Sequence, residues 1–301
     1  MPRACSGAPP SASTEPGARA TTTAGELRAR ARRELVAAGR ELDGREATML
    51  LARVLGCGEA ALLAHPEAPV SATDEACFLA LLERRLAGEP FAYLVGEREF
   101  YGRDFAVDRR VLIPRPETEH LVQAVLDLAP PRALVADIGT GSGCIALTLA
   151  LERHDLRVVA TDRSLPALRV AASNRRRHGL EDRVALLAGD LCDGLALSRF
   201  DVVASNPPYV DHEQRESLQV EVRDHEPPGA LFAAEGGLAC YRRLLDARAR
   251  RAPGSLLVVE IGAGQLEALR ALALPAFELE SVVHDYGGVP RVMALRQRSL
   301  G

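Results

Sequence analysis

The segment Ser205-Asn206-Pro207-Pro208-Tyr209 places an amide, two prolines and an aromatic ring in consecutive positions. The proline rings keep the backbone extended and leave carbonyl oxygens free to accept hydrogen bonds. The side-chain oxygen of Asn206 and the carbonyl of Pro207 can each accept one N–H of a planar amide, and the Tyr209 ring can lie flat against it. Such a cage holds a weakly nucleophilic nitrogen in line with an electrophilic methyl group. The segment therefore predicts methyl transfer to an amide or amine nitrogen.

A glycine-rich loop, Asp137-Ile138-Gly139-Thr140-Gly141-Ser142-Gly143, follows an apolar run and precedes a helical pattern. Glycines at such a place let the backbone approach a ligand closely. A dinucleotide fingerprint would need its third glycine at Cys144, which disfavours a nicotinamide dehydrogenase. The Gly-x-Gly-x-Gly spacing after an acidic strand end instead resembles the S-adenosylmethionine loop of class I methyltransferases.

Two further acidic residues come where the next strands are expected to end. Asp162 lies about twenty residues beyond the glycines and can accept both hydroxyls of a ribose, although an Asp after a strand can also cap a helix. Gly189-Asp190 offers a carboxylate to an exocyclic adenine amine, although Gly-Asp is also an ordinary turn. Leu191 follows and can pack on an adenine ring.

Composition excludes several classes of chemistry. The 301 residues contain 37 basic side chains, and all of them are arginine because the chain has no lysine. Schiff-base and pyridoxal-phosphate lysines and Walker-A loops are therefore absent. The net charge of -4 and the lack of tryptophan disfavour capture of nucleic acid by bulk charge or stacking. Six scattered cysteines indicate reduced thiols, with no metal site.

The elements that must position these residues alternate between strand and helix after Arg132. An α/β fold with a doubly wound, seven-stranded, mostly parallel sheet is predicted, and its antiparallel strands come from a C-terminal hairpin across Tyr286-Gly287-Gly288. The expected strands are 133–137, 156–161, 184–187, 200–204, 255–261, 277–283 and 289–295. The expected helices are 142–153, 165–178, 238–252 and 265–273.

The first third of the chain differs from this pattern. Residues 1–24 are poor in large apolar side chains and are predicted to be a disordered tail. Residues 25–90 show helical periodicity, with a capping box from Asp43 to Glu46 and a cap at Ser71, and form a predicted helical bundle. Residues 91–115 are expected to form a linker with a hairpin between Phe91 and Val107, and 116–301 the main domain.

Together the motifs resemble the release factor glutamine methyltransferase family. Besides the two loops, the likeness covers Gly88-Glu-Pro90, Gly96-Glu-Arg-Glu-Phe100-Tyr, Leu112-Ile-Pro-Arg-Pro-Glu-Thr-Glu119, Glu226-Pro-x-x-Ala-Leu231 and Asp285-Tyr-Gly. The resemblance spans about Gly25 to Leu295. It implies methylation of the glutamine side-chain amide in the Gly-Gly-Gln loop of bacterial class-I peptide chain release factors, with a helical N-terminal domain for substrate recognition.

The resemblance also implies a role for each site residue. Asp137 and the loop residues Gly139, Thr140, Gly141, Ser142 and Gly143 hold the methionine part of S-adenosylmethionine. Asp162 holds the ribose, and Asp190 and Leu191 lie at the adenine, where some family members carry an aromatic residue in place of Leu191. Asn206, Pro207, Pro208 and Tyr209 receive the glutamine, and Asn206 also borders the cofactor.

Other interpretations remain open at this stage. A DNA or RNA amino-methyltransferase could use the same loop on an exocyclic adenine amine, but it would need a basic recognition region. A nonenzymatic cofactor-binding protein would not need Asn206. The long stretch 210–235, which holds Arg223 and Glu226, is either a substrate-gripping flap or a mobile insertion. We expect a cytoplasmic monomer without a metal, a membrane span or direct nucleic-acid binding.

Overall fold

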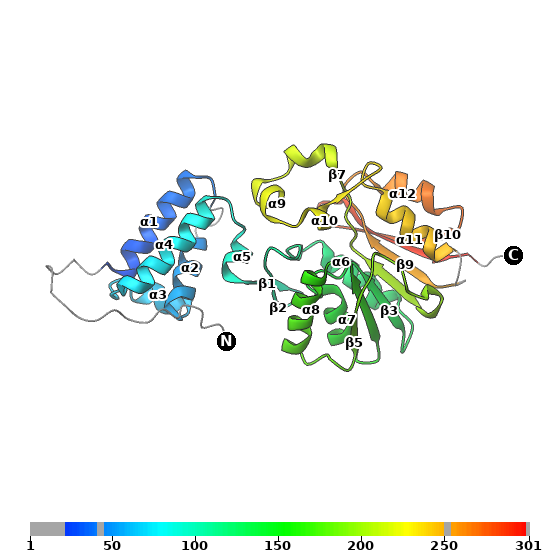
Figure 1. The fold of residues 1–301 in the computed structure, drawn as a ribbon, viewed down its shortest axis with the longest axis horizontal. Coiled ribbons are helices and arrows are strands. Elements are labelled where there is room, and N and C mark those ends of the chain that lie inside the picture. The colour runs from blue at the N-terminus through cyan, green and yellow to red at the C-terminus, as the bar shows by residue number, and fades with distance from the viewer. Residues whose placement is uncertain (1–21, 41–44, 250–253, 299–301) are drawn as a thin grey trace. The chain divides into compact units, whose positions relative to one another are not determined.

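The computed structural model describes residues 22–40, 45–249 and 254–298, and the chain divides into two compact units, Met1–Ala87 and Gly88–Gly301 (Figure 1). Residues 91–115, expected to be a linker, fall within the second unit. The sequence places the same division near residue 90, after the glycine that follows the last helix of the bundle.

The first unit is a bundle of amphipathic helices. Its described helices are α1 (Ala24–Ala37), α2 (Glu46–Leu55), α3 (Glu59–Ala64) and α4 (Ala72–Leu86). Their buried side chains recur at helical spacing, and they include Leu27, Ala31, Leu35, Leu50, Leu51, Phe78 and Leu82. The predicted cap of α4 is confirmed, because the Ser71 side chain accepts a hydrogen bond from the Asp74 N–H.

Local capping explains where the sequence prediction missed a boundary in this bundle. The helix α1 begins at Ala24, inside the segment assigned to a tail, because Thr23 and Glu26 form a reciprocal capping box. The predicted cap at Asp43 lies outside the described residues, and Arg45, which precedes α2, makes no side-chain capping bond. The short helix α3 was not predicted.

The second unit opens with a short helix and a hairpin. The hairpin predicted between Phe91 and Val107 is present but starts later than expected, since its first residues form α5 (Phe91–Val95). Gly96 ends that helix at φ 78°, and the buried Tyr93 hydroxyl donates to the Val111 carbonyl at 2.6 Å, so tertiary packing overrides the strand propensity of these residues. The hairpin itself pairs β1 (Glu97–Phe100) with β2 (Arg103–Ala106) across Tyr101-Gly102, both at positive φ.

A seven-stranded sheet forms the centre of the second unit, as predicted. Its order is β10-β11-β9-β6-β3-β4-β5, and β11 is antiparallel to both of its neighbours while the other pairings are parallel. Its strands are β3 (Leu134–Ile138), β4 (Arg157–Asp162), β5 (Val184–Ala188), β6 (Val202–Ser205), β9 (Leu256–Glu260), β10 (Phe277–His284) and β11 (Pro290–Gln297).

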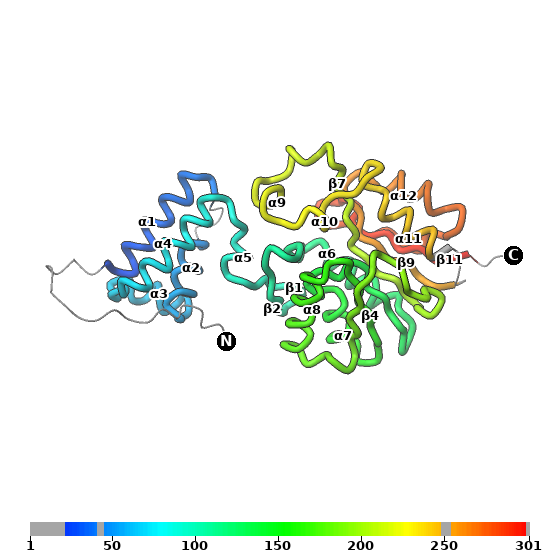
Figure 2. The backbone as a smooth tube through the Cα atoms, in the orientation of Figure 1, coloured from blue at the N-terminus to red at the C-terminus, as the bar shows by residue number. Residues whose placement is uncertain are grey.

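Helices cover both faces of this sheet, and the trace in Figure 2 shows the two groups on either side of the strands. The helices are α6 (Thr118–Leu128), α7 (Cys144–Glu152), α8 (Leu165–Arg177), α11 (Ala239–Ala249) and α12 (Leu266–Ala273). Alternate residues of a strand serve opposite cores: Val135 packs with α6 and α7, and Ala136 packs with α11 and α12. The strands therefore need apolar residues on both faces, which explains their unbroken apolar runs.

The stretch 210–235, interpreted from the sequence as a flap or an insertion, contains several short helices and strands. It contains β7 (Val210–Asp211), η2 (His212–Ser217), α9 (Val220–His225), α10 (Pro228–Leu231) and β8 (Phe232–Ala233). Its two short strands pair in parallel through Val210–Phe232 and Asp211–Ala233. These elements are too short for a clear periodic pattern, so their apolar residues gave no signal in the sequence.

Candidate functional site

Strand register brings the predicted site residues to one edge of the sheet. Ile138 is paired with Thr161 and with Ser205, and Ser205 is paired with Val259, so the four lie in one row across β4, β3, β6 and β9. The residue that follows each of them stands at the carboxyl end of a parallel strand. These residues are Asp162, Gly139, Asn206 and Glu260. Ligands of open parallel sheets bind at this edge.

The glycine loop presents open backbone at that edge. Gly139 and Gly141 have φ of 77° and 56°, and a Cβ atom built on either would meet no atom within 4 Å. Gly143 serves packing instead, because its Cβ would lie 3.1 Å from Leu147 and 3.3 Å from Ala171. Two of the three glycines therefore face space that a ligand can fill, and the third lets α7 approach α8.

The carboxylate of Asp137 lies behind the loop. It is 0% exposed, and its Oδ2 accepts from the Thr140 hydroxyl at 2.6 Å. Burial raises the pKa of Asp137 to about 7, and the nearby Asp162 adds to the rise while the bond from Thr140 opposes it. Asp137 thus holds the glycine loop in place through its buried hydrogen bond with Thr140. Thr140 and Ser142 are buried beside it.

Asp162 is held firmly at the loop. Its Oδ2 accepts from the Gly141 N–H at 2.9 Å and its Oδ1 accepts from the Ser164 N–H at 2.8 Å. Ser164 caps α8, so the helix-start interpretation of Asp162 describes part of what the residue does. Each carboxylate oxygen keeps further acceptor capacity for a ligand hydroxyl.

Asp190 and Leu191 follow β5, farther along the same edge. The Asp190 carboxylate accepts from Arg243 of α11 at 2.9 Å, an ion pair that the sequence did not suggest. Leu191 is half-buried against the core on the α11 face and has a φ of 52°, an uncommon value for a residue with a side chain. The carboxylate is therefore oriented by a neighbouring helix.

The Asn206–Tyr209 loop is anchored at both ends. The Asn206 amide Nδ2 donates to the Thr118 hydroxyl at 3.2 Å, and the Gln265 amide donates to the Tyr209 carbonyl at 3.0 Å. The Tyr209 hydroxyl points toward Glu260 Oε1, 3.5 Å away. Burial raises the pKa of the Tyr209 hydroxyl, so this group stays protonated. Pro207 is buried and Pro208 is half-buried between the anchors.

Two glycines make room for this loop. A Cβ on Gly237 would lie 2.1 Å from the Tyr209 carbonyl oxygen, and a Cβ on Gly262 would lie 3.0 Å from the Tyr209 ring. Gln265 completes the contact, because its Oε1 accepts from the Gly262 N–H at 3.0 Å while its nitrogen reaches Tyr209. The loop conformation thus depends on residues that follow it by about thirty to fifty-five positions.

Sequence reasoning missed Glu260, which ends β9 and is 2% exposed. Burial is the largest cause that raises its pKa to about 7, while nearby Thr118 and Asn206 favour its charged form. A signal was present in the sequence, since Glu260 is a single charge that ends the apolar run Leu256–Val259. Thr118 and Gln265 were also missed, because polar residues near helix starts are common.

The stretch 210–235 uses Glu226 for an internal contact. Its side chain is 1% exposed, accepts from Arg115, and accepts from the Ile113 N–H at 3.4 Å. Arg223 pairs with Glu216 at 3.1 Å and with Asp224 at 2.8 Å. In this structure both residues therefore make contacts within the protein, and Glu226 ties the stretch to the Ile113–Arg115 segment.

The described residues hold no cluster of three or more His, Cys, Asp or Glu side chains that could bind a metal ion. Within the same residues, no helix is both long and apolar enough to cross a membrane.

Two protein-family models match parts of this chain. Residues 26–96 match the PrmC N-terminal domain family, and residues 117–223 match the methyltransferase small domain family. The release factor glutamine methyltransferase of Nitratidesulfovibrio vulgaris is 40% identical over 90% of this chain and 94% of its own length. That of Bordetella pertussis is 45% identical over 82% of this chain and 92% of its own length.

A solved methyltransferase from Pyrococcus furiosus shares the fold, with a TM-score of 0.51 at 16% identity over 72% of this chain and 98% of its own. The methyltransferase domain implies S-adenosylmethionine as the methyl donor, and the open glycine loop with Asp162 beside it fits that molecule. The identity and coverage of its relatives show that the chain belongs to the release factor glutamine methyltransferase family.

Proposed function

We propose that this chain methylates the side-chain amide nitrogen of the glutamine in the Gly-Gly-Gln motif of class-I peptide chain release factors. The observation that carries the proposal is the orientation of the Asn206 side-chain amide. Its Nδ2 donates to Thr118 at 3.2 Å, so its oxygen is the end left to accept an N–H, one strand away from the open glycine loop. An acceptor beside a methyl-donor site suits an amide substrate.

The residues proposed to hold the cofactor line the carboxyl edge of the sheet. When bound, S-adenosylmethionine supplies an electrophilic methyl group. The backbone from Gly139 to Gly143 would receive its methionine part, with Asp137 bracing the loop through Thr140. Asp162 would accept from the ribose hydroxyls, while Asp190 and Leu191 would border the adenine. Ser142 and Asn206 complete the proposed set.

The proposed acceptor residues act on the geometry and charge of the substrate amide. The Asn206 oxygen and the Pro207 carbonyl each accept one N–H, which holds the nitrogen in line and draws its lone pair out of conjugation. Pro208 keeps the loop extended, and the Tyr209 ring packs on the amide plane. A methylated nitrogen becomes acidic and loses its proton readily, so the chain needs no lysine base.

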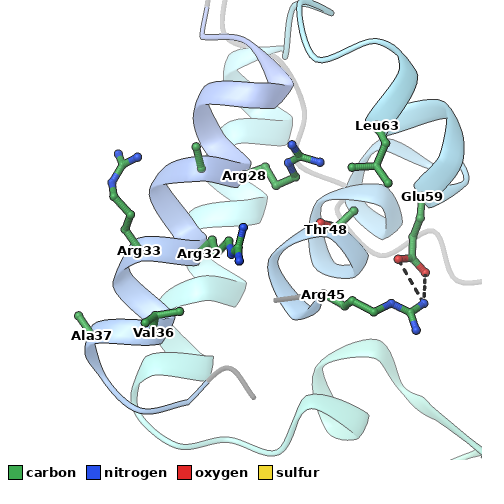
Figure 3. Close-up of a pocket in the computed structure, with 10 residues that line it drawn as sticks. Arg28, Arg32, Arg33, Val36, Ala37, Arg45, Thr48, Glu59 and Leu63 are labelled. Carbon is green, nitrogen blue, oxygen red and sulfur yellow. Dashed lines mark hydrogen bonds and ion pairs between the residues drawn. The ribbon is translucent and has the colours of Figure 1, made fainter. Parts of the chain in front are cut away.

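The helical unit, residues 25–90, is proposed to recognise the protein substrate. A pocket of about 950 Å³ lies among α1, α2 and α3, and Arg28 and Arg32 point toward it (Figure 3). Val36 and Leu63 line it although they are 57% and 52% exposed. Arginines beside exposed apolar side chains suit an acidic, amphipathic segment of a protein partner.

The remaining proposals concern the roles of the chain's segments, its oligomeric state and its location. We propose that residues 91–115 connect the units and that 116–301 carry the catalysis. Most of the predicted tail, residues 1–21, lies outside the described residues. The enzyme is proposed to act as a cytoplasmic monomer without direct nucleic-acid binding. The net charge of -4 supports the last point, because nucleic-acid binding depends on cationic contacts to phosphates.

The test combines the purified chain with labelled cofactor and, in separate reactions, a class-I release factor, DNA and RNA. Label is expected only on the release factor, at its Gly-Gly-Gln glutamine. A release factor with Gly-Gly-Glu in that place is the matched substrate control and should stay unlabelled. Label on DNA or RNA alone would instead support the amino-methyltransferase alternative.

A further inference from the structure

Glu260 is a charged side chain buried in the core at the end of β9. It is 2% exposed, and its Oε2 makes no full hydrogen bond within the described residues. The Tyr209 hydroxyl approaches its Oε1 only to 3.5 Å. An ionised carboxylate removed from water without close partners costs several kcal/mol. The packing of β9 does not require this charge, because the preceding residues Leu256–Val259 are apolar.

The polar groups around Glu260 include residues of the Asn206–Tyr209 loop, called the acceptor loop below, and of α6. Asn206 and Thr118 lie close enough to the carboxylate to favour its charged form. The same two residues are joined by the bond from Asn206 Nδ2 to the Thr118 hydroxyl at 3.2 Å. Strand register gives the same neighbourhood, because Asn206 and Glu260 directly follow the paired residues Ser205 and Val259. The NH2 end of Asn206 is the end bonded to Thr118, a residue that also neighbours Glu260.

An asparagine amide has two ends of nearly equal shape, and a rotation of about 180° exchanges them. The Thr118 hydroxyl does not favour the NH2 end of Asn206 over its oxygen, since a hydroxyl both donates and accepts hydrogen bonds. An ionised carboxylate only accepts, so it attracts the NH2 end and repels the oxygen. A carboxylate at Glu260 therefore discriminates the two orientations.

We propose that Glu260 is a positioning residue that holds the Asn206 amide with its oxygen toward the substrate, an inference that rests on the proposed function. In the reversed orientation the NH2 group would face the substrate amide, donor against donor. That arrangement would repel the nitrogen that must be held for methyl transfer. Glu260 thus acts through Asn206 and does not itself touch the substrate.

The orientation depends on the ionisation of Glu260, because a protonated carboxyl could donate to the Asn206 oxygen and stabilise the reversed amide. Burial and Glu117 of the α6 N-terminus raise the pKa of Glu260 to about 7, and Arg291 of β11 lowers it. Tyr209 faces the carboxylate from the loop.

From α11, the Tyr241 hydroxyl donates to the Glu260 backbone carbonyl at 2.8 Å. Burial also holds the pKa of the Tyr241 hydroxyl well above its usual value, so it stays protonated beside Glu260. Methyl transfer should therefore accelerate as pH rises through about 7.

The main test is Glu260→Gln, assayed for methylation of a release factor with kcat and KM separated. We expect kcat to fall about 10- to 100-fold, the usual range for loss of a charged hydrogen-bond partner, while KM and the cofactor Kd change by less than about threefold. The acid limb of the pH profile should disappear in this variant. Glu278→Gln is the matched control, since Glu278 is an exposed glutamate of β10, which β11 separates from β9, and it should match the wild type.

A double variant separates positioning from general support of the fold. If Glu260 acts through Asn206, then Asn206→Ala with Glu260→Gln should be no slower than Asn206→Ala alone. Additive losses, or a Glu260→Gln rate within about twofold of the wild type, would overturn the inference. If Glu260→Gln does not fold, the wild-type pH profile decides, and a flat profile between about pH 6 and 8 overturns it. A wild type that leaves the release factor unlabelled rejects the proposed function itself.

Discussion

Gln265 donates from its side-chain amide to the backbone carbonyl of Tyr209 at 3.0 Å, which joins the start of α12 to the end of the acceptor loop. Because the Gln265 oxygen also accepts from the Gly262 N–H at 3.0 Å, the orientation of this amide is fixed. The Asn206–Tyr209 loop, which is proposed to receive the substrate, is thereby tied to the turn that follows β9.

Gln265→Glu replaces the donor to Tyr209 with a carboxylate that can only accept. Two oxygens would then face each other, and the end of the loop should move. We expect kcat for methylation to fall about tenfold, with cofactor affinity nearly unchanged. Steady-state kinetics and calorimetric cofactor titration measure both quantities. Gln219→Glu, at an exposed position before α9, is the control. Equal kcat in the two variants would show that the Gln265 contact is dispensable.

Gly237→Ala should damage the same loop by steric overlap. The new Cβ would lie 2.1 Å from the Tyr209 carbonyl oxygen, at a residue with φ of 85°. Gly264→Ala is the matched control, since its φ is 81° and no atom lies within 4 Å of the added Cβ. Both variants bear the backbone strain of roughly 1 kcal/mol, but only Gly237→Ala should also lose activity. Thermal unfolding and methylation assays distinguish strain from overlap, and equal activity losses would exclude the overlap.

Gly141→Ala should weaken cofactor binding more than it weakens the fold. Its Cβ would project into open space beside Asp162, where the methionine part of the cofactor is proposed to lie. Gly179→Ala, after α8, has a similar φ of 65° and equally open space. The two should lose similar stability, about 1 kcal/mol, whereas only Gly141→Ala should raise the cofactor Kd, by about tenfold or more. Unchanged affinity would place the cofactor elsewhere.

The buried Glu226 and its partner Arg115 should respond unequally to substitution. Arg115→Ala leaves the carboxylate with only the Ile113 N–H at 3.4 Å, while Arg115 itself is 31% exposed and can return to water. We expect Arg115→Ala to destabilise the second unit by about 1–3 kcal/mol, because it leaves a buried charge. Glu226→Gln should destabilise it by less, because the glutamine oxygen can still accept from Arg115 and no buried charge remains, although the bond from the Ile113 N–H is lost. Chemical denaturation and limited proteolysis within 210–235 measure the effect. Equal losses would mean that the charge of Glu226 is not the cause.

The pH dependence of stability should reveal the buried Asp137. Its pKa is raised from 3.8 to about 7, so the native state binds this proton more tightly than the unfolded chain does. Its contribution is therefore complete below about pH 4 and is lost as pH rises to about 7, at roughly 1.4 kcal/mol for each unit of pKa difference.

Asp137→Asn removes the loss of stability between pH 4 and 7, because asparagine does not ionise. Its side chain still offers an oxygen to the Thr140 hydroxyl. The gain in unfolding free energy over the wild type should grow between pH 4 and 7, as followed by urea denaturation. Asp155→Asn is the opposite control, because Arg153 lowers the pKa of Asp155 and its stabilisation is present above the ordinary pKa. A pH-independent difference for Asp137→Asn would show that the pKa of Asp137 is the same in the native and unfolded states.

Much of the main fold could be predicted from local sequence signals. Unbroken apolar runs such as Leu256–Val259 predicted strands buried on both faces, and the helical spacing of Leu121, Val122 and Val125 would equally have indicated α6. The site loops were also recognisable, since glycines at strand ends permit unusual backbone conformations and prolines restrict them, whatever surrounds them. Where local propensity conflicted with packing, as for Tyr93 in α5, the predicted start of the hairpin was wrong.

The sequence by itself determined the alternating fold, the family resemblance and the position of the two loops, because these depend on neighbours in the chain. The tertiary structure decided which side chains orient them. Glu260 meets Asn206, and Gln265 meets Tyr209, because parallel register sets the ends of β6 and β9 side by side. Residues more than fifty positions apart carry no local sign of that contact. The polar network behind the acceptor loop is therefore a property of strand register, and sequence spacing alone could not predict it.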